Sequence, residues 1–148
     1  MGVFKKALKF GEGIYELIPQ RAPFVFVDAF YGENDGLFQC GFTPGIEGYF
    51  VENGFLTEPG IIENMAQSAA ASSGWSYSEK GEEVPIGFIG AVADFELIQL
   101  PAIGEEIRTN IRFLGEFAGV SLVEAECSQR EELFAKGKLK IFINNEKQ

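Results

Sequence analysis

A run of small and apolar residues near the middle of the chain limits its fold more than any other feature. The run, PGIIENMAQSAAASSGW, covers residues 59–75. A helix with so little polar surface has to be buried on nearly all sides. Pro59 suits the first position of a helix, and either Gly74 or Gly81 is suited to end it. We therefore expect one long buried helix over residues 59–78.

Glu63 is the only charged residue between Pro59 and Tyr77. An unpaired carboxylate is costly to bury, because it loses its hydration. We therefore expect Glu63 to lie in an active-site cleft. The alternatives are a buried carboxylate that is hydrogen-bonded for structural reasons, or one that is exposed where the helix enters a cleft.

Segments typical of β-strands lie on both sides of this helix in the sequence. They are FVFVDAFY (24–31), LFQCGFTP (37–44), VPIGFIGAVADFELIQL (84–100), EEIRTNIRFLGEF (105–117), VSLVEAECSQR (120–130) and LFAKGKLKIFIN (133–144). Several of them alternate apolar and polar residues, as expected of a strand with one buried face. Turn residues predict a hairpin from the first two and an antiparallel meander from the last three. A short helical turn (14–20) and a glycine-rich loop (45–58) complete the prediction.

One long helix and about six strands predict an α+β fold in which an antiparallel sheet wraps around the helix, the hotdog arrangement. Small side chains over residues 69–74 would let the sheet approach the helix closely. The chain, residues 1–148, is long enough for one such domain and too short for two. A single sheet leaves an uncovered edge, so we expect a homodimer, or a heterodimer with another hotdog subunit.

Composition argues against several classes of function. The net charge of −10 disfavours nucleic acid as a partner, because phosphate contacts need clustered lysine and arginine. No apolar run approaches a membrane span and the N-terminus lacks a secretory signal, so we expect a cytoplasmic protein that does not enter membranes. Cys40 and Cys127 are too few for a disulfide framework, and the sequence contains no histidine. We therefore expect no metal site.

Three lysines alternate in the last predicted strand. Lys136, Lys138 and Lys140 would all point to the same side of the sheet. One interpretation is a solvated face or a strand edge protected by lysines. The other is a docking site for an acidic partner, such as a carrier protein.

The chain also resembles a known family. The segments IYELIPQRAPFVFVDAF (14–30) and GYF…PGIIENMAQSAA (48–70) are similar to the two signatures of the β-hydroxyacyl-(acyl carrier protein) dehydratases, and VPIGFIGAVADFELIQLPAIGEEI (84–107) resembles the strand that follows them. The resemblance implies a dimeric hotdog with a tunnel for a phosphopantetheine-linked acyl chain. It also implies that a loop histidine and a helix acid from two subunits remove water from a 3-hydroxyacyl thioester. No cofactor is implied, since the phosphopantetheine arm would belong to the substrate.

Matching the signatures residue by residue leaves the acid but not the base. Glu63 corresponds to the family acid and follows Tyr49 by 14 residues, as in the family. Tyr49 stands where the family has its catalytic histidine, Gln20 replaces the histidine of the first signature, and Val51 replaces a proline. A tyrosine with a pKa near 10 is a poor base at neutral pH. We predict Glu63 and Tyr49 as the catalytic residues, with Tyr49 as a packing residue as the alternative.

Three further residues are candidates for binding the substrate. The N–H of Gly60, near the helix start, would be placed to hold a thioester carbonyl. Gln67, one turn after Glu63, would orient the acid or the ligand, or would serve as a helix contact. Phe50 lies next to Tyr49 in the predicted loop.

Three functions fit this sequence. The first is a dehydratase of fatty-acid or polyketide-type biosynthesis that acts on acyl carrier protein or acyl-CoA thioesters, with Glu63 as the acid and a group other than histidine (water or Tyr49) as the base. The second is a hotdog thioesterase, whose helix carboxylate activates water or attacks the thioester without requiring histidine. The third is a non-catalytic subunit that binds an acyl carrier or completes the site of an active dehydratase.

Overall fold

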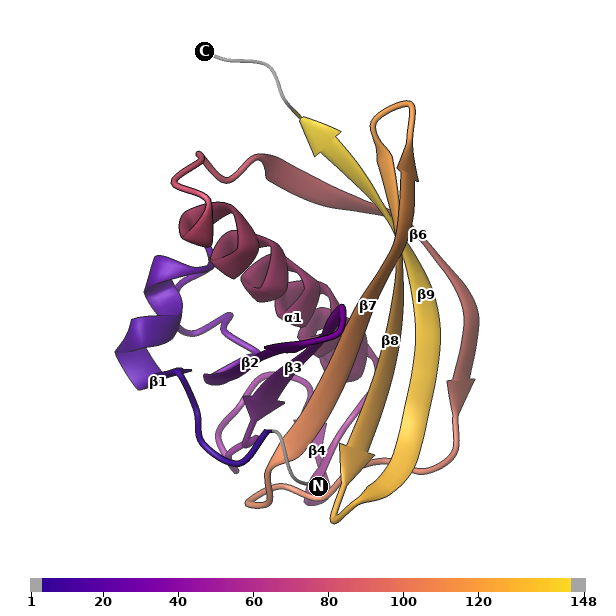
Figure 1. Ribbon diagram of the computed structural model, residues 1–148. Coiled ribbons are helices and arrows are strands. Elements are labelled where there is room, and N and C mark those ends of the chain that lie inside the picture. Colours follow the sequence, from indigo (N-terminus) through magenta and orange to yellow (C-terminus); the bar gives the residue numbers. More distant parts are fainter. Residues whose placement is uncertain (1–3, 145–148) are drawn as a thin grey trace.

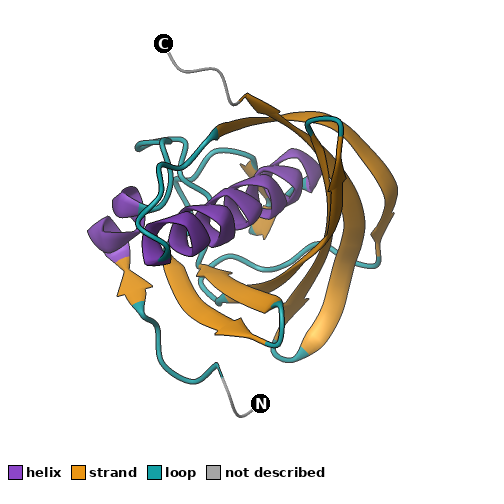
Figure 2. Ribbon diagram, turned by 45° about the horizontal axis from the view of Figure 1, so that its top comes forward, coloured by secondary structure: helices purple, strands orange, loops and turns teal. Residues whose placement is uncertain are grey.

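The computed structural model describes residues 4–144 and shows a curved antiparallel sheet around one long helix (Figures 1 and 2). The expected α+β hotdog fold is confirmed. The sheet has seven strands in the order β1-β2-β3-β7-β8-β9-β6. Their bounds are β1 Lys9–Phe10, β2 Ala29–Asn34, β3 Leu37–Phe42, β7 Ile107–Phe117, β8 Val120–Gln129, β9 Glu132–Asn144 and β6 Ile86–Leu97.

The helix α1 (Glu58–Glu79) is one residue longer at each end than the predicted helix. Thr57 precedes it in an extended conformation, and Pro59 lies in its first turn. The small residues that predicted burial do allow close packing. A Cβ atom at Gly74, for example, would collide with the carbonyl oxygen of Leu17. Within residues 4–144, no helix is both long and apolar enough to cross a membrane.

The last three strands form the predicted antiparallel meander, in which β7 pairs with β8 and β8 with β9. The strand that follows the helix, β6, pairs with β9 on the far side of this meander. Strand β6 therefore forms one edge of the sheet (Figure 1). Its pairing with β9 is interrupted by two irregularities, between Ile89 and Ala91 and between Ala93 and Glu96.

The structure differs from the prediction in the first half of the chain. The helical turn expected over 14–20 is the 3-10 helix η1 (Gly11–Glu16). The predicted loop contains a short hairpin of β4 (Val51–Glu52) and β5 (Phe55–Leu56). Strand β2 begins only at Ala29, although the apolar run starts at residue 24. The reason is that side chains of α1, described next, bind the backbone of residues 24–26.

Candidate active site

Glu63 lies on the second turn of α1, half-buried. Its carboxylate accepts a hydrogen bond of 3.2 Å from the side-chain amide of Gln67. That amide is itself fixed, because its oxygen accepts the Phe26 N–H at 2.7 Å and its nitrogen also donates to the Phe24 carbonyl at 3.0 Å. Gln67 therefore connects the acid to the backbone of residues 24–26.

Asn64 holds the same segment from the next position on the helix. Its amide nitrogen donates to the Phe26 carbonyl at 2.7 Å, and its oxygen accepts the Thr109 hydroxyl of β7 at 2.6 Å. Asn64 and Gln67 are both buried, so Phe26 has its N–H and its carbonyl satisfied by helix side chains. These bonds fix the rotation of α1, and with it the direction of Glu63. Sequence analysis missed Asn64, although an amide directly beside the acid in a largely apolar helix was a local clue.

Tyr49 and Phe50 stack on the segment that Gln67 and Asn64 hold. The Tyr49 ring lies 4.6 Å from the Phe24 ring, and Phe50 lies 5.7 Å from Phe26. Tyr49 is 48% exposed, and the described residues provide no hydrogen bond between its hydroxyl and Glu63. An apolar cavity of about 40 Å³ lies beside Tyr49, lined in part by Phe26. The fold thus attaches the acid and the residue in the histidine position to one segment, without a hydrogen bond between them among the described residues.

Gly60 is buried in the first turn of α1. Its N–H donates to the Thr57 carbonyl at 3.0 Å, so holding a thioester carbonyl would require this bond to open. A Cβ atom at position 60 would collide with Leu56 and lie close to Phe50. Close packing of the loop on the helix is a sufficient reason for glycine here.

The three lysines of β9 alternate with buried residues and point outward. The ammonium groups of Lys136 and Lys138 lie 3.4 and 3.9 Å from the carboxylates of Glu96 and Asp94 on β6. On the neighbouring strand β8, Glu126 and Glu124 lie opposite Lys136 and Lys138, respectively. Lys140 has only apolar cross-strand partners. The charges of Lys136 and Lys138 are therefore partly neutralised, and Lys140 is the lysine best placed for an acidic partner.

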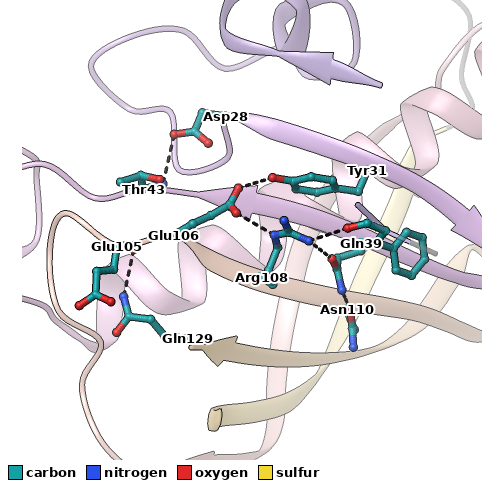
Figure 3. A network of polar contacts seen from close by, with 10 residues as sticks. Asp28, Tyr31, Gln39, Thr43, Glu105, Glu106, Arg108, Asn110 and Gln129 are labelled. Carbon is teal, nitrogen blue, oxygen red and sulfur yellow. Dashed lines mark hydrogen bonds and ion pairs between the residues drawn. The ribbon is translucent and has the colours of Figure 1, made fainter. Parts of the chain in front are cut away.

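A second group of polar side chains lies on the outer face of the sheet (Figure 3). Arg108 is at its centre: its Nε donates to Glu106 at 2.8 Å and its Nη1 donates to Gln39 at 2.6 Å. The guanidinium also lies 3.6 Å from the centre of the Tyr31 ring. The Tyr31 hydroxyl donates to the second oxygen of Glu106 at 2.6 Å. These contacts join β2, β3 and β7, and sequence analysis missed them because they link three separate strands.

Burial raises the pKa of Tyr31 in this group and of Asp28 beside it. Burial, opposed by a hydrogen bond from the Thr43 N–H, raises the pKa of Asp28 to about 6. Burial and the hydrogen bond to Glu106 raise the pKa of Tyr31 to about 12. The neighbouring outer groove has a volume of about 390 Å³, and Arg108 is among its lining residues. Glu63 does not line this groove, so we treat the group as structural.

A comparison with known protein families identifies the family of this chain. The model of the ApeP-like dehydratases matches residues 12–148. The chain belongs to the ApeP-like dehydratase family. The resemblance to hotdog dehydratases is thus confirmed, and this chain is a divergent member of that group without histidine. No curated protein sequence matches the chain.

Solved structures share the fold of this ApeP-like chain. The ApeI:P dehydratase heterocomplex from Xenorhabdus doucetiae is 21% identical, with a TM-score of 0.76 over 95% of this chain and 94% of that chain. A hypothetical thioesterase from Streptococcus pneumoniae, solved with coenzyme A, is 8% identical, with a TM-score of 0.62 over 80% and 87%. Protein PH1136 from Pyrococcus horikoshii is 12% identical, with a TM-score of 0.64 over 84% and 88%. At these identities the structures support the fold alone.

Proposed function

We propose that this chain is the acid-bearing subunit of a cytoplasmic hotdog complex that dehydrates 3-hydroxyacyl thioesters. The observation that carries the proposal is the half-buried Glu63 carboxylate, which Gln67 holds in a chain without histidine. Membership of the ApeP-like dehydratase family supports the reaction class. The thioester would come from fatty-acid or polyketide-type biosynthesis, carried by an acyl carrier protein or by coenzyme A.

Dehydration of a 3-hydroxyacyl thioester requires two proton transfers. A base removes a proton from the carbon next to the thioester carbonyl, the bond from the β-carbon to oxygen breaks, and an acid protonates the departing hydroxyl. The products are an enoyl thioester and water. Protonated Glu63 would supply the acid. Tyr49, half-exposed and without a hydrogen bond to Glu63 in the described chain, is poorly placed to be the base.

A second hotdog subunit would supply the base. The similar structure from Xenorhabdus doucetiae is a dehydratase heterocomplex, which supports this arrangement. The described sheet also leaves the edge of β6 unpaired, and Phe88 on that strand is 59% exposed. Covering this edge with another sheet would bury apolar surface. A homodimer remains the alternative to this heterodimer.

The experiment compares the purified chain alone with the chain mixed with a histidine-containing hotdog subunit from the same organism. The substrate is a 3-hydroxyacyl thioester, and formation of the conjugated enoyl product is followed by absorbance. We expect the mixture to be active and the lone chain to be much slower. Glu63→Gln should reduce the rate of the mixture by about 10²–10⁴, the usual contribution of a general acid. Glu58→Gln, an exposed acid at the start of the same helix, is the matched control and should change little.

Two results would contradict this proposal. Dehydration by the lone chain at the rate of the mixture, lost in Glu63→Gln, would show that no partner base is needed. Release of free thiol without enoyl product would favour the thioesterase function instead. That second candidate is supported by the carboxylate of Glu63, which could activate water without histidine, and by fold neighbours described as thioesterases.

A further inference from the structure

The loop before the exposed edge strand β6 and the end of that strand carry acidic residues, and this segment contains no basic residue. Residues 81–97 contain Glu82, Glu83, Asp94 and Glu96, but neither lysine nor arginine. All four acidic residues are exposed. Lys80, the residue before this segment, lies over the ring of Tyr77 on its own helix.

The two pairs of acids have different surroundings. Asp94 and Glu96 lie 3.9 and 3.4 Å from Lys138 and Lys136 of β9, the adjacent strand further inside the sheet. These ion pairs neutralise part of the charge at the end of β6. Glu82 and Glu83 form no ion pair with any described residue. The two glutamates of the loop before β6 therefore lack a neutralising ion-pair partner among the described residues.

This distribution disfavours pairing of β6 with a second copy of itself. In a two-fold symmetric antiparallel pair, the start of one strand lies beside the end of the other. Glu82 and Glu83 of one copy would then approach Asp94 and Glu96 of the other copy. Because residues 81–97 contain neither lysine nor arginine, no register between the two copies of this segment pairs opposite charges. Like charges across a strand pair are destabilising, and opposite charges stabilise it.

We propose that the edge of β6 selects a different hotdog subunit, whose edge strand carries lysine or arginine beside these acids, over a second copy of this chain. The proposal rests on the proposed function, in which a second subunit completes the site. The apolar side chains Phe88 and Ile89 of β6, 59% and 38% exposed, supply the surface to be buried. The flanking acids determine which partner covers it.

The test reverses the charge at the start of the strand. In Glu82→Lys/Glu83→Lys, the new lysines of one copy would lie beside Asp94 and Glu96 of the other in an antiparallel pair. We expect this variant to form a homodimer at micromolar concentration in low salt, and the wild-type chain to be a monomer under the same conditions. Sedimentation velocity and light scattering measure the mass, and circular dichroism checks that the variant is folded.

A matched variant separates local charge from net charge. Glu12→Lys/Glu47→Lys also replaces two exposed glutamates, far from residues 81–97 in sequence. Each replacement adds two positive charges, so either double variant changes the net charge from −10 to −6. We expect the control to stay monomeric. The dimer of the first variant should weaken at 1 M salt, where the screening length falls to about 3 Å.

Two results would overturn the proposal. One is a wild-type chain that is already a stable dimer in low salt. The other is an equal response of the two double variants, which would show that net charge alone controls association. Neither result depends on catalysis, so the rate loss in Glu63→Gln still decides the proposed function separately.

Discussion

Replacing Gln67 with methionine keeps most of the side-chain volume but removes three hydrogen bonds. The most important of them is the 2.7 Å bond from the Phe26 N–H, because both residues are buried. Without Gln67 this N–H has no acceptor, and an orphaned buried donor costs about 1–3 kcal/mol. The Phe24 carbonyl belongs to an exposed residue and can bind water instead. We therefore expect Gln67→Met to lower the free energy of unfolding by about 2 kcal/mol.

Urea denaturation measures this loss, with the fluorescence of Trp75, the only tryptophan, as the probe. Trp75 packs against Phe30 and Phe38 between the helix and the sheet, so its signal reports on the core. The midpoint should shift while the dependence on urea stays constant. Glu63→Gln is the control, because it leaves the bonds of Gln67 to the backbone in place. A loss below about 0.5 kcal/mol in Gln67→Met, the usual range for a surface change, would refute the reasoning.

Two further changes test the packing and the electrostatics of the fold. Gly74→Ala should destabilise the protein by about 1–3 kcal/mol in the same urea assay, because its Cβ meets the Leu17 carbonyl oxygen; Gly45→Ala, which meets open space, should be near neutral. Burial raises the pKa of Asp28 from 3.8 to about 6. Between these pH values the folded state binds a proton at Asp28 that the unfolded state has lost. The free energy of unfolding should therefore fall as the pH rises through that interval. Asp28→Asn should remove this fall, about 3 kcal/mol, when urea titrations are repeated across the interval; a fall that persists in the variant would assign it to another group.

The helix and its acid were predictable because their pattern is local. Residues 59–78 are apolar on nearly every side, which requires burial whatever surrounds them, and the helix observed is Glu58–Glu79. Glu63 and Gln67 are one turn apart, so their contact follows from helix geometry alone. The meander was predictable for a similar reason, since its turns join strands that are neighbours in the sequence.

The surroundings of the acid were not predictable, because they depend on contacts between distant residues. Asn64 and Gln67 reach the backbone of Phe26 across 38 and 41 positions. An apolar run such as residues 24–27 indicates burial, but it does not show whether its N–H groups bind a neighbouring strand or an amide side chain. The outer group around Arg108 is similar, since its contact with Gln39 spans 69 positions. The alternation of apolar and polar residues indicates on which face of the sheet a side chain lies. Only the strand order shows which residues are next to it on that face.

The anchoring of Gln67 explains how this fold can keep an acid in place without a base. Its bonds to Phe24 and Phe26 involve only backbone atoms of these residues, and the residue at position 49 takes no part in them. In a site where the acid and the base held each other, loss of the base would free the acid to move. Here Gln67 positions Glu63 from within the same chain, which supports the proposal that the base lies on another subunit. A divided site of this kind requires that the acid be held independently of its catalytic partner, and the contacts of Gln67 meet that requirement.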